Sequence, residues 1–442
     1  MLMLAVCVHG KAADLSGMWL GTVTASGVEL RLALHITRGE QGGFGGTMDS
    51  LDQSANGIPL ANIKVEGEAV RFEVPLAGAS FEGRLDEEGR EIAGTLHQGQ
   101  ANMALTFKRT NAIPVPMRPQ EPKKPYPYDE VEASYENPSQ GVKLAGTLTV
   151  PREGKPVPAV LLISGSGPQN RDEELMGHKP FKLLADYLTR RGIAVLRVDD
   201  RGTGGSSGSL MNSTTADFAT DALAGIAYLK TRSEVDPARI GLLGHSEGGV
   251  VALIAASGSK DVRFIVMLAG TAVPGEQVLY AQGEAILRAQ GLNEMMIAAN
   301  QKIQKRIFET LRAQKDDRAA AETIKGFAGE VEARRAANPW FRRFLELDPA
   351  GYLRKVTCPV MALNGEKDTQ VLARQNLPVF AKTLEEAGNR DYAIVKLPRL
   401  NHLFQTANTG HPSEYARIEE TMAPVALETI FHWILKHTNK GN

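Results

Sequence analysis

The 442-residue sequence contains only two cysteines, Cys7 and Cys358, and no cysteine/histidine spacing of the kind that binds zinc. Two cysteines cannot form the disulfide framework of a small cross-linked domain. The fold must therefore depend on a hydrophobic core, and no metal site is expected. Cys358 precedes a proline at the start of an apolar run, and we interpret it as a small core residue rather than a reactive thiol.

The sequence also lacks an excess of positive charge. Fifty lysines and arginines face fifty-one aspartates and glutamates, and the formal net charge is −1. Proteins that bind a phosphate backbone usually carry a basic surplus or a basic stripe. Nucleic acid is therefore not expected as a partner.

Long apolar runs are missing as well, because no segment approaches the roughly 20 residues that a membrane-spanning helix needs. The first eight residues are apolar, and Gly10-Lys11-Ala12 places small residues at the −3 and −1 positions of a cleavage site. We interpret residues 1–12 as the remnant of a secretory signal peptide, although its usual basic start is missing. The expected location is periplasmic or secreted, with a cytoplasmic protein as the alternative.

The length and an apolar content of 43% indicate two or three domains with a sizeable core. Residues 14–110 carry short segments in which apolar and polar residues alternate, most clearly at 28–36, and glycine-rich turns separate them. This pattern predicts a small all-β barrel or sandwich domain. Residues 111–129 contain six prolines, which favour an extended linker.

From residue 130 to 442 the pattern changes to strand, loop and helix. Apolar β-rich runs alternate with segments of helical periodicity, and nearly continuous apolar character indicates strands that are covered on both faces. The sequence predicts a doubly wound α/β domain whose strands include residues 159–163, 193–198, 240–243, 264–268, 360–363 and 393–397. Residues from about 275 to 348 hold no strand-like run and predict a helical insertion, either a cap over the active site or a surface hairpin remote from it.

One motif of this domain indicates nucleophilic catalysis. Ser246 lies in Gly-x-Ser-x-Gly between the strand at 240–243 and an apolar helical segment, and this is the context of a nucleophile elbow. A second copy of the motif surrounds Ser206, but it lies in a run of glycine and serine that predicts a loop. We therefore predict Ser246 as the nucleophile.

A serine hydroxyl needs a base, and the base needs an orienting acid. Asp368 follows the strand at 360–363 in an acidic loop, with Glu366 as its competitor. His402 follows the last predicted strand, and His411 is the alternative base. Asp368 and His402 stand in the order nucleophile, acid, histidine that this fold requires.

Small residues after the strand at 159–163 could let main-chain N–H groups face a developing oxyanion. Pro168 has no N–H, so the donor must precede it. We predict the main-chain N–H groups of Ser166 and Glu247 as the oxyanion hole, with Gly167 as the second choice for the former.

Residues 130–442 resemble bacterial EstD-like carboxylesterases of the α/β-hydrolase superfamily. The motifs that carry the resemblance are Gly165-Ser166-Gly167-Pro168, Asn170-Arg171-Asp172, Asp200-Arg201-Gly202, the run around Ser246, and Asn401-His402-Leu403-Phe404. The resemblance implies hydrolysis of small or short-chain acyl esters without a cofactor. It also implies a Ser246–His402–Asp368 triad.

Three other readings stay open. A serine peptidase or amidase of the same fold would use the same triad. A nucleotide-binding oxidoreductase is suggested only by a partial glycine motif at residues 202–207. The β-domain could bind carbohydrate, a partner or a second protomer, and the sequence does not indicate an oligomeric state.

Overall fold

The computed structural model describes residues 14–25, 28–39, 42–53, 55–114, 117–152 and 154–439. The predicted signal-peptide remnant, residues 1–12, lies outside the described residues. The chain divides into two compact units, one of residues 1–117 with 415–417 and one of residues 118–414 with 418–442. Among the described residues, no helix has both the length and the apolar character to cross a membrane.

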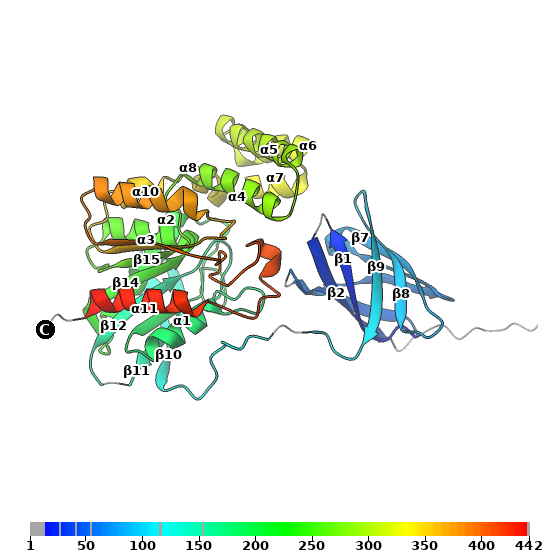
Figure 1. The fold of residues 1–442 in the computed structure, drawn as a ribbon, viewed down its shortest axis with the longest axis horizontal. Helices are drawn as coiled ribbons and strands as arrows, with labels where there is room; N and C mark the ends of the chain where they lie inside the picture. Colours follow the sequence, from blue (N-terminus) through cyan, green and yellow to red (C-terminus); the bar gives the residue numbers. More distant parts are fainter. Residues whose placement is uncertain are drawn as a thin grey trace, which may run out of the picture. The chain divides into compact units, whose positions relative to one another are not determined.

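The first unit is a nine-stranded antiparallel sheet in the order β4-β3-β2-β1-β9-β8-β7-β6-β5 (Figure 1). Its end strands β4 and β5 are consecutive in the chain and are separated only by Leu60. The two edges of the sheet must therefore lie close together, and the sheet curls into a barrel. The barrel is filled by buried apolar side chains that include Trp19, Phe72, Phe81 and Phe107. The strands are β1 Gly17–Ala25, β2 Val28–Arg38, β3 Phe44–Ser50, β4 Ala55–Pro59, β5 Ala61–Glu66, β6 Ala69–Val74, β7 Ala79–Leu85, β8 Glu91–Gln98 and β9 Ala101–Thr110, with a 3-10 turn at Pro75–Ala77.

The second unit is built on an eight-stranded sheet in the order β10-β11-β13-β12-β14-β15-β16-β17. The first two strands are antiparallel to their neighbours, and the other six are parallel. The sequence patterns indicate the parallel strands but not the antiparallel pair. The strands are β10 Tyr128–Asn137, β11 Val142–Pro151, β12 Val157–Ile163, β13 Ala194–Val198, β14 Val235–His245, β15 Ile265–Leu268, β16 Val360–Gly365 and β17 Tyr392–Leu397.

Helices cover both faces of this sheet (Figure 1). Helices α1 (Pro180–Thr189) and α11 (Pro424–Thr438) pack on one face. Helices α2 (Thr215–Lys230), α3 (Glu247–Gly258) and α10 (Ala373–Glu386) pack on the other. Helix α3 is apolar almost all round, because it is enclosed by the sheet and by its neighbours. This is the arrangement of an α/β-hydrolase.

The predicted helical stretch forms a group of helices inserted between β15 and β16, with an apolar core of its own (Figure 1). Buried aromatic and aliphatic side chains such as Phe308, Leu311, Phe341 and Phe344 hold the group together. The inserted helices are α4 Gly275–Ala289, α5 Glu294–Ala313, α6 Asp317–Ala328, α7 Glu330–Ala336 and α8 Pro339–Glu346, followed by α9 Pro349–Leu353. Further along the chain, burial raises the pKa of the Cys358 thiol to about 11, so this cysteine stays protonated at neutral pH.

Candidate active site

Ser246 occupies the sharp turn between β14 and α3. Its backbone has φ 53° and ψ −118°, which side chains other than glycine rarely adopt. The main-chain N–H of Ser246 donates to the carbonyl of Leu268 at 2.7 Å and fixes the turn against β15. The strand, strained turn and helix together match the geometry of a nucleophile elbow.

Two glycines of the motif are required by close backbone contacts. A Cβ on Gly244 would lie 1.9 Å from the carbonyl oxygen of Gly248. A Cβ on Gly248 would lie 2.1 Å from the carbonyl oxygen of Ile163. Both distances are far below van der Waals contact, so only glycine allows the turn to pack against β12. The structure thus gives a steric reason for the Gly-x-Ser-x-Gly spacing.

A cavity of about 260 Å³ lies at this turn. Four of the five predicted site residues line it, and these are Ser246, His402, Ser166 and Glu247. The other lining residues include the ionisable Glu173, His245 and Arg335, and a set of apolar or uncharged residues: Leu175, Thr271, Val278, Leu279, Trp340, Phe344, Gln370 and Val371. The volume of the cavity suits a small substrate.

The fifth residue, Asp368, lies behind His402. Its Oδ2 is 2.9 Å from His402 Nδ1, and Oδ1 accepts from the main-chain N–H groups of Gln370 and Val371, each at 2.8 Å. Both residues of this pair are buried, with His402 4% exposed and Asp368 4% exposed. An ionised carboxylate can only accept, so Nδ1 carries the proton and Nε2 is left as the basic nitrogen.

The competing candidates have other partners. Glu366 is exposed and accepts from the main-chain N–H of Arg399 at 3.1 Å. His411 is bonded to Ser413, two residues away. Ser206 Oγ donates to the carbonyl of Asp199 at 2.7 Å and accepts from the N–H of Ala145 at 2.9 Å. None of these three side chains lines the cavity at Ser246.

Ser246 and His402 line the same cavity without a direct hydrogen bond. Among the hydrogen bonds of the described residues, none joins Ser246 Oγ to His402. Catalytic hydrogen bonds are often long in the absence of substrate and shorten in the reacting complex. Both residues line the wall of one cavity.

The main-chain donors of the predicted oxyanion hole are free of other acceptors. Within the described residues, no hydrogen bond is formed by the N–H of Ser166 or of Glu247. The preceding N–H, of Gly165, is already used, because it donates to Glu173 Oε1 at 2.7 Å. The two free groups border the cavity that contains Ser246.

A buried pair next to the triad was not predicted from the sequence. The Nε2 of His245 donates to the main-chain carbonyl of His402 at 3.0 Å, and its Nδ1 lies 2.9 Å from Glu173 Oε1. Burial lowers the pKa of His245, but the Glu173 carboxylate outweighs it and leaves the pKa above its ordinary value. His245 thus links the backbone of His402 to the Glu173 carboxyl group. Two features of the sequence point to this pair. His245 directly precedes Ser246, and Glu173 directly follows the motif Asn170-Arg171-Asp172.

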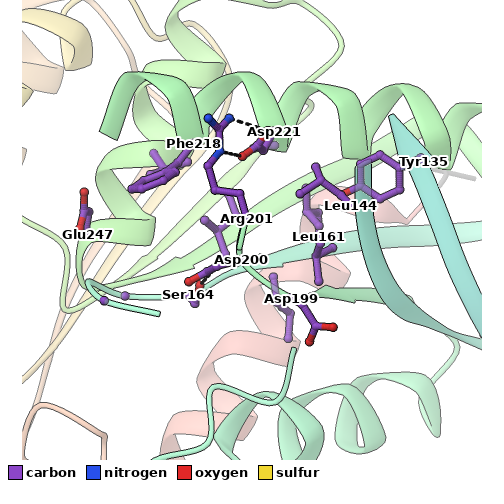
Figure 2. A pocket seen from close by; sticks show the side chains of 17 residues that line it. Tyr135, Leu144, Leu161, Ser164, Asp199, Asp200, Arg201, Phe218, Asp221 and Glu247 are labelled. Carbon is purple, nitrogen blue, oxygen red and sulfur yellow. Dashed lines mark hydrogen bonds and ion pairs between the residues drawn. The ribbon is translucent and has the colours of Figure 1, made fainter. Parts of the chain in front are cut away.

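Asp200 lies at a second, smaller cavity of about 60 Å³ on the other side of Glu247. Ser164 Oγ donates to one carboxyl oxygen at 2.6 Å, and the N–H of Gln169 donates to the other at 3.0 Å. Figure 2 shows Asp200 beside Ser164, while Arg201 turns toward Asp221. Burial raises the pKa of Asp200 from its ordinary value near 3.8 to about 7.

This shift predicts a stability change with pH. The folded chain holds the Asp200 proton more tightly than the unfolded chain. The contribution of Asp200 to the free energy of unfolding is therefore fully present at about pH 4 and is lost as the pH rises toward about 7. Asp200→Asn keeps the side chain neutral and should remove this part of the slope. Thermal melting from acidic to neutral pH tests it, with Glu87→Gln as the control at an exposed turn. A D200N protein that loses stability with pH as steeply as the wild type would contradict the prediction.

Taken with its site, the fold defines a serine hydrolase of the α/β-hydrolase superfamily. The family model described as X-Pro dipeptidyl-peptidase (S15 family) matches residues 140–399, more than half of the chain, and the chain belongs to this family. The chain is also 29% identical over 294 residues to Esterase EstD of Thermotoga maritima. That alignment covers 66% of each protein, so the chain spans about two thirds of this relative. The resemblance to EstD-like esterases is thus confirmed.

Solved structures with a similar fold are more distant. A hypothetical protein from Pseudomonas aeruginosa is 18% identical with a TM-score of 0.47, and covers 70% of this chain and 94% of its own. An esterase from Pyrococcus furiosus is 18% identical with a TM-score of 0.45, and covers 71% of this chain and 92% of its own. Est1E from Butyrivibrio proteoclasticus with bound ferulic acid is 19% identical with a TM-score of 0.43, and covers 69% of this chain and 98% of its own.

Proposed function

We propose that the protein is a carboxylesterase that hydrolyses small or short-chain acyl esters through a Ser246–His402–Asp368 triad and an acyl-enzyme intermediate. The observation that carries the proposal is the buried hydrogen bond between His402 Nδ1 and Asp368, on an imidazole that shares a cavity with the strained Ser246. No metal-binding cluster of three or more His, Cys, Asp or Glu side chains occurs in the described part of the chain.

The reaction follows from the tautomer of His402. Its Nε2 takes the proton of Ser246 as Oγ attacks the ester carbonyl, and Asp368 stabilises the imidazolium that forms. The main-chain N–H groups of Ser166 and Glu247 bind the oxyanion. Histidine then gives its proton to the leaving alcohol, and water cleaves the acyl-enzyme by the same route.

The oxyanion donors act only in the transition state, because the carbonyl oxygen becomes charged as the tetrahedral intermediate forms. One such donor is typically worth about 3 kcal/mol of barrier. The N–H of Glu247 also begins helix α3, so the positive end of the helix dipole adds to the stabilisation.

The inserted helices α4 to α8 act in this proposal as a cap. Val278 and Leu279 of α4, Arg335 of α7, and Trp340 and Phe344 of α8 line the same cavity as Ser246. A cavity of about 260 Å³ with a partly buried aromatic wall suits a short acyl chain better than an extended lipid.

The second candidate is a serine peptidase or amidase, which the description of the S15 family favours. We expect p-nitrophenyl acetate and butyrate to be cleaved much faster than X-Pro p-nitroanilides, because the supporting relative is an esterase. Comparison of kcat/KM for the two substrate series decides between them. Faster release of nitroaniline than of nitrophenol would replace the esterase proposal by the peptidase one, with the same triad.

A further inference from the structure

The side chain of Glu247 is buried, although the residue lines the substrate cavity. The residue is 4% exposed, and three side chains donate to its carboxyl group. Thr215 Oγ1 and Trp340 Nε1 donate to Oε1 at 2.6 Å and 2.7 Å, and Ser166 Oγ donates to Oε2 at 2.7 Å. Within the described residues no lysine, arginine or histidine forms an ion pair with it. These neutral hydrogen bonds must compensate for the burial of the carboxyl.

The three donors come from three separate elements. Ser166 lies in the loop after β12, Thr215 is the first residue of α2, and Trp340 belongs to α8 of the inserted helices. Glu247 itself is the first residue of α3, directly after the nucleophile. One carboxyl group therefore joins four segments at the wall of the active-site cavity.

The contact with Trp340 is the only one of the three whose direction is fixed by chemistry. An indole N–H can only donate, whereas the two hydroxyl groups can also accept. The Trp340 ring stacks on Phe344, with centroids 5.1 Å apart and an angle of 19° between the rings, and both residues line the substrate cavity. Loss of the acceptor at residue 247 would thus release the aromatic wall of the cavity.

Glu247 also separates two cavities. It lines the substrate cavity of about 260 Å³ and the inner cavity of about 60 Å³. Figure 2 shows its side chain at the edge of the inner cavity, apart from the Arg201–Asp221 pair.

We propose that the Glu247 side chain is a positioning group that couples the cap to the oxyanion hole, because it holds Trp340 over the cavity and Ser166 beside the nucleophile at the same time. The catalytic consequence rests on the proposed esterase activity. The coupling itself does not, because it can be observed without a substrate.

The structural test uses the fluorescence of Trp340, obtained as the difference between each protein and its own Trp340→Phe variant. Glu247→Leu keeps a similar volume but offers no acceptor, so we expect acrylamide to quench Trp340 severalfold more efficiently. Glu247→Gln keeps one acceptor oxygen and should restore protection. Unchanged quenching in E247L would overturn the proposal, even if the wild type cleaves no ester.

The kinetic test is a double-mutant cycle on kcat/KM for a short-chain ester. E247L and W340F should each lower kcat/KM, E247L by at least about tenfold, and the double variant should be no worse than E247L. A rise in KM would report displacement of Trp340 in the cap. A fall in kcat would report displacement of Ser166 in the oxyanion loop. Trp433→Phe, a buried tryptophan of α11, is the matched control and should combine with E247L additively.

If E247L does not fold, the cycle between Ser166→Ala and W340F replaces it. Each variant removes one donor to the same carboxyl group, so the two changes should be coupled through Glu247. Independent, multiplicative effects of S166A and W340F would contradict the proposal.

Discussion

Replacement of Ser246 by alanine is expected to lower kcat for ester hydrolysis by about 10³- to 10⁶-fold while the protein stays folded. In the proposed mechanism this hydroxyl forms the acyl-enzyme, and no other serine or threonine hydroxyl occupies the strained turn at the cavity. Alanine has the same Cβ at φ 53°, so the strain of the turn is unchanged. Steady-state kinetics together with thermal melting separate the loss of chemistry from a loss of structure.

The matched control for this change is Ser206→Ala in the second copy of the motif. Ser206 Oγ joins the carbonyl of Asp199 to the N–H of Ala145, so its loss should cost about 1 kcal/mol of stability and little activity. Equal losses of kcat in S206A and S246A would show that the nucleophile is assigned to the wrong serine.

Replacement of Asp368 by asparagine is expected to lower kcat by about 10⁴-fold. The reason lies in the partners of its two oxygens. Oδ1 accepts two main-chain N–H groups, so the amide oxygen of an asparagine must take that place. The amide NH₂ then faces His402 Nδ1 and makes it the acceptor. The proton moves to Nε2, and the imidazole can no longer take a proton from Ser246.

The control for this variant is Glu366→Gln in the same loop. Glu366 is exposed and bonded to the main chain of Arg399, away from His402. We expect E366Q to keep activity close to that of the wild type. A larger loss in E366Q than in D368N would reverse the assignment of the acid.

The sequence predicts those parts of the fold that rest on local pattern. Parallel strands such as β12 and β16 are continuous apolar runs, because helices cover both of their faces. The antiparallel pair β10 and β11 was not predicted from the sequence. Strand β10 is rich in exposed acidic residues, and its identity depends on pairing with β11 rather than on apolar content. Similarly, β14 begins at Val235, before the predicted strand at 240–243. The sequence does not indicate this start, because residues 236–239 form no apolar run.

The candidate site likewise contains residues that the sequence predicts and residues that it does not. Ser246, Asp368 and His402 stand in a chain order and in loop positions that the fold itself imposes, so the sequence indicates them. The roles of Glu173, His245 and the Glu247 side chain depend on which polar groups are buried together. Glu173 and His245 are 72 residues apart, and Glu247 and Trp340 are 93 apart. No local pattern connects residues at such separations.

The most direct measurement is to label the native protein with a fluorophosphonate probe and to identify the modified residue by peptide mass spectrometry. Phosphonylation of Ser246, lost in S246A and strongly slowed in D368N, is the result expected of a serine raised by the turn before α3 and activated by His402. A label on Ser206 or another residue, or no label on a protein that hydrolyses esters, would contradict this account.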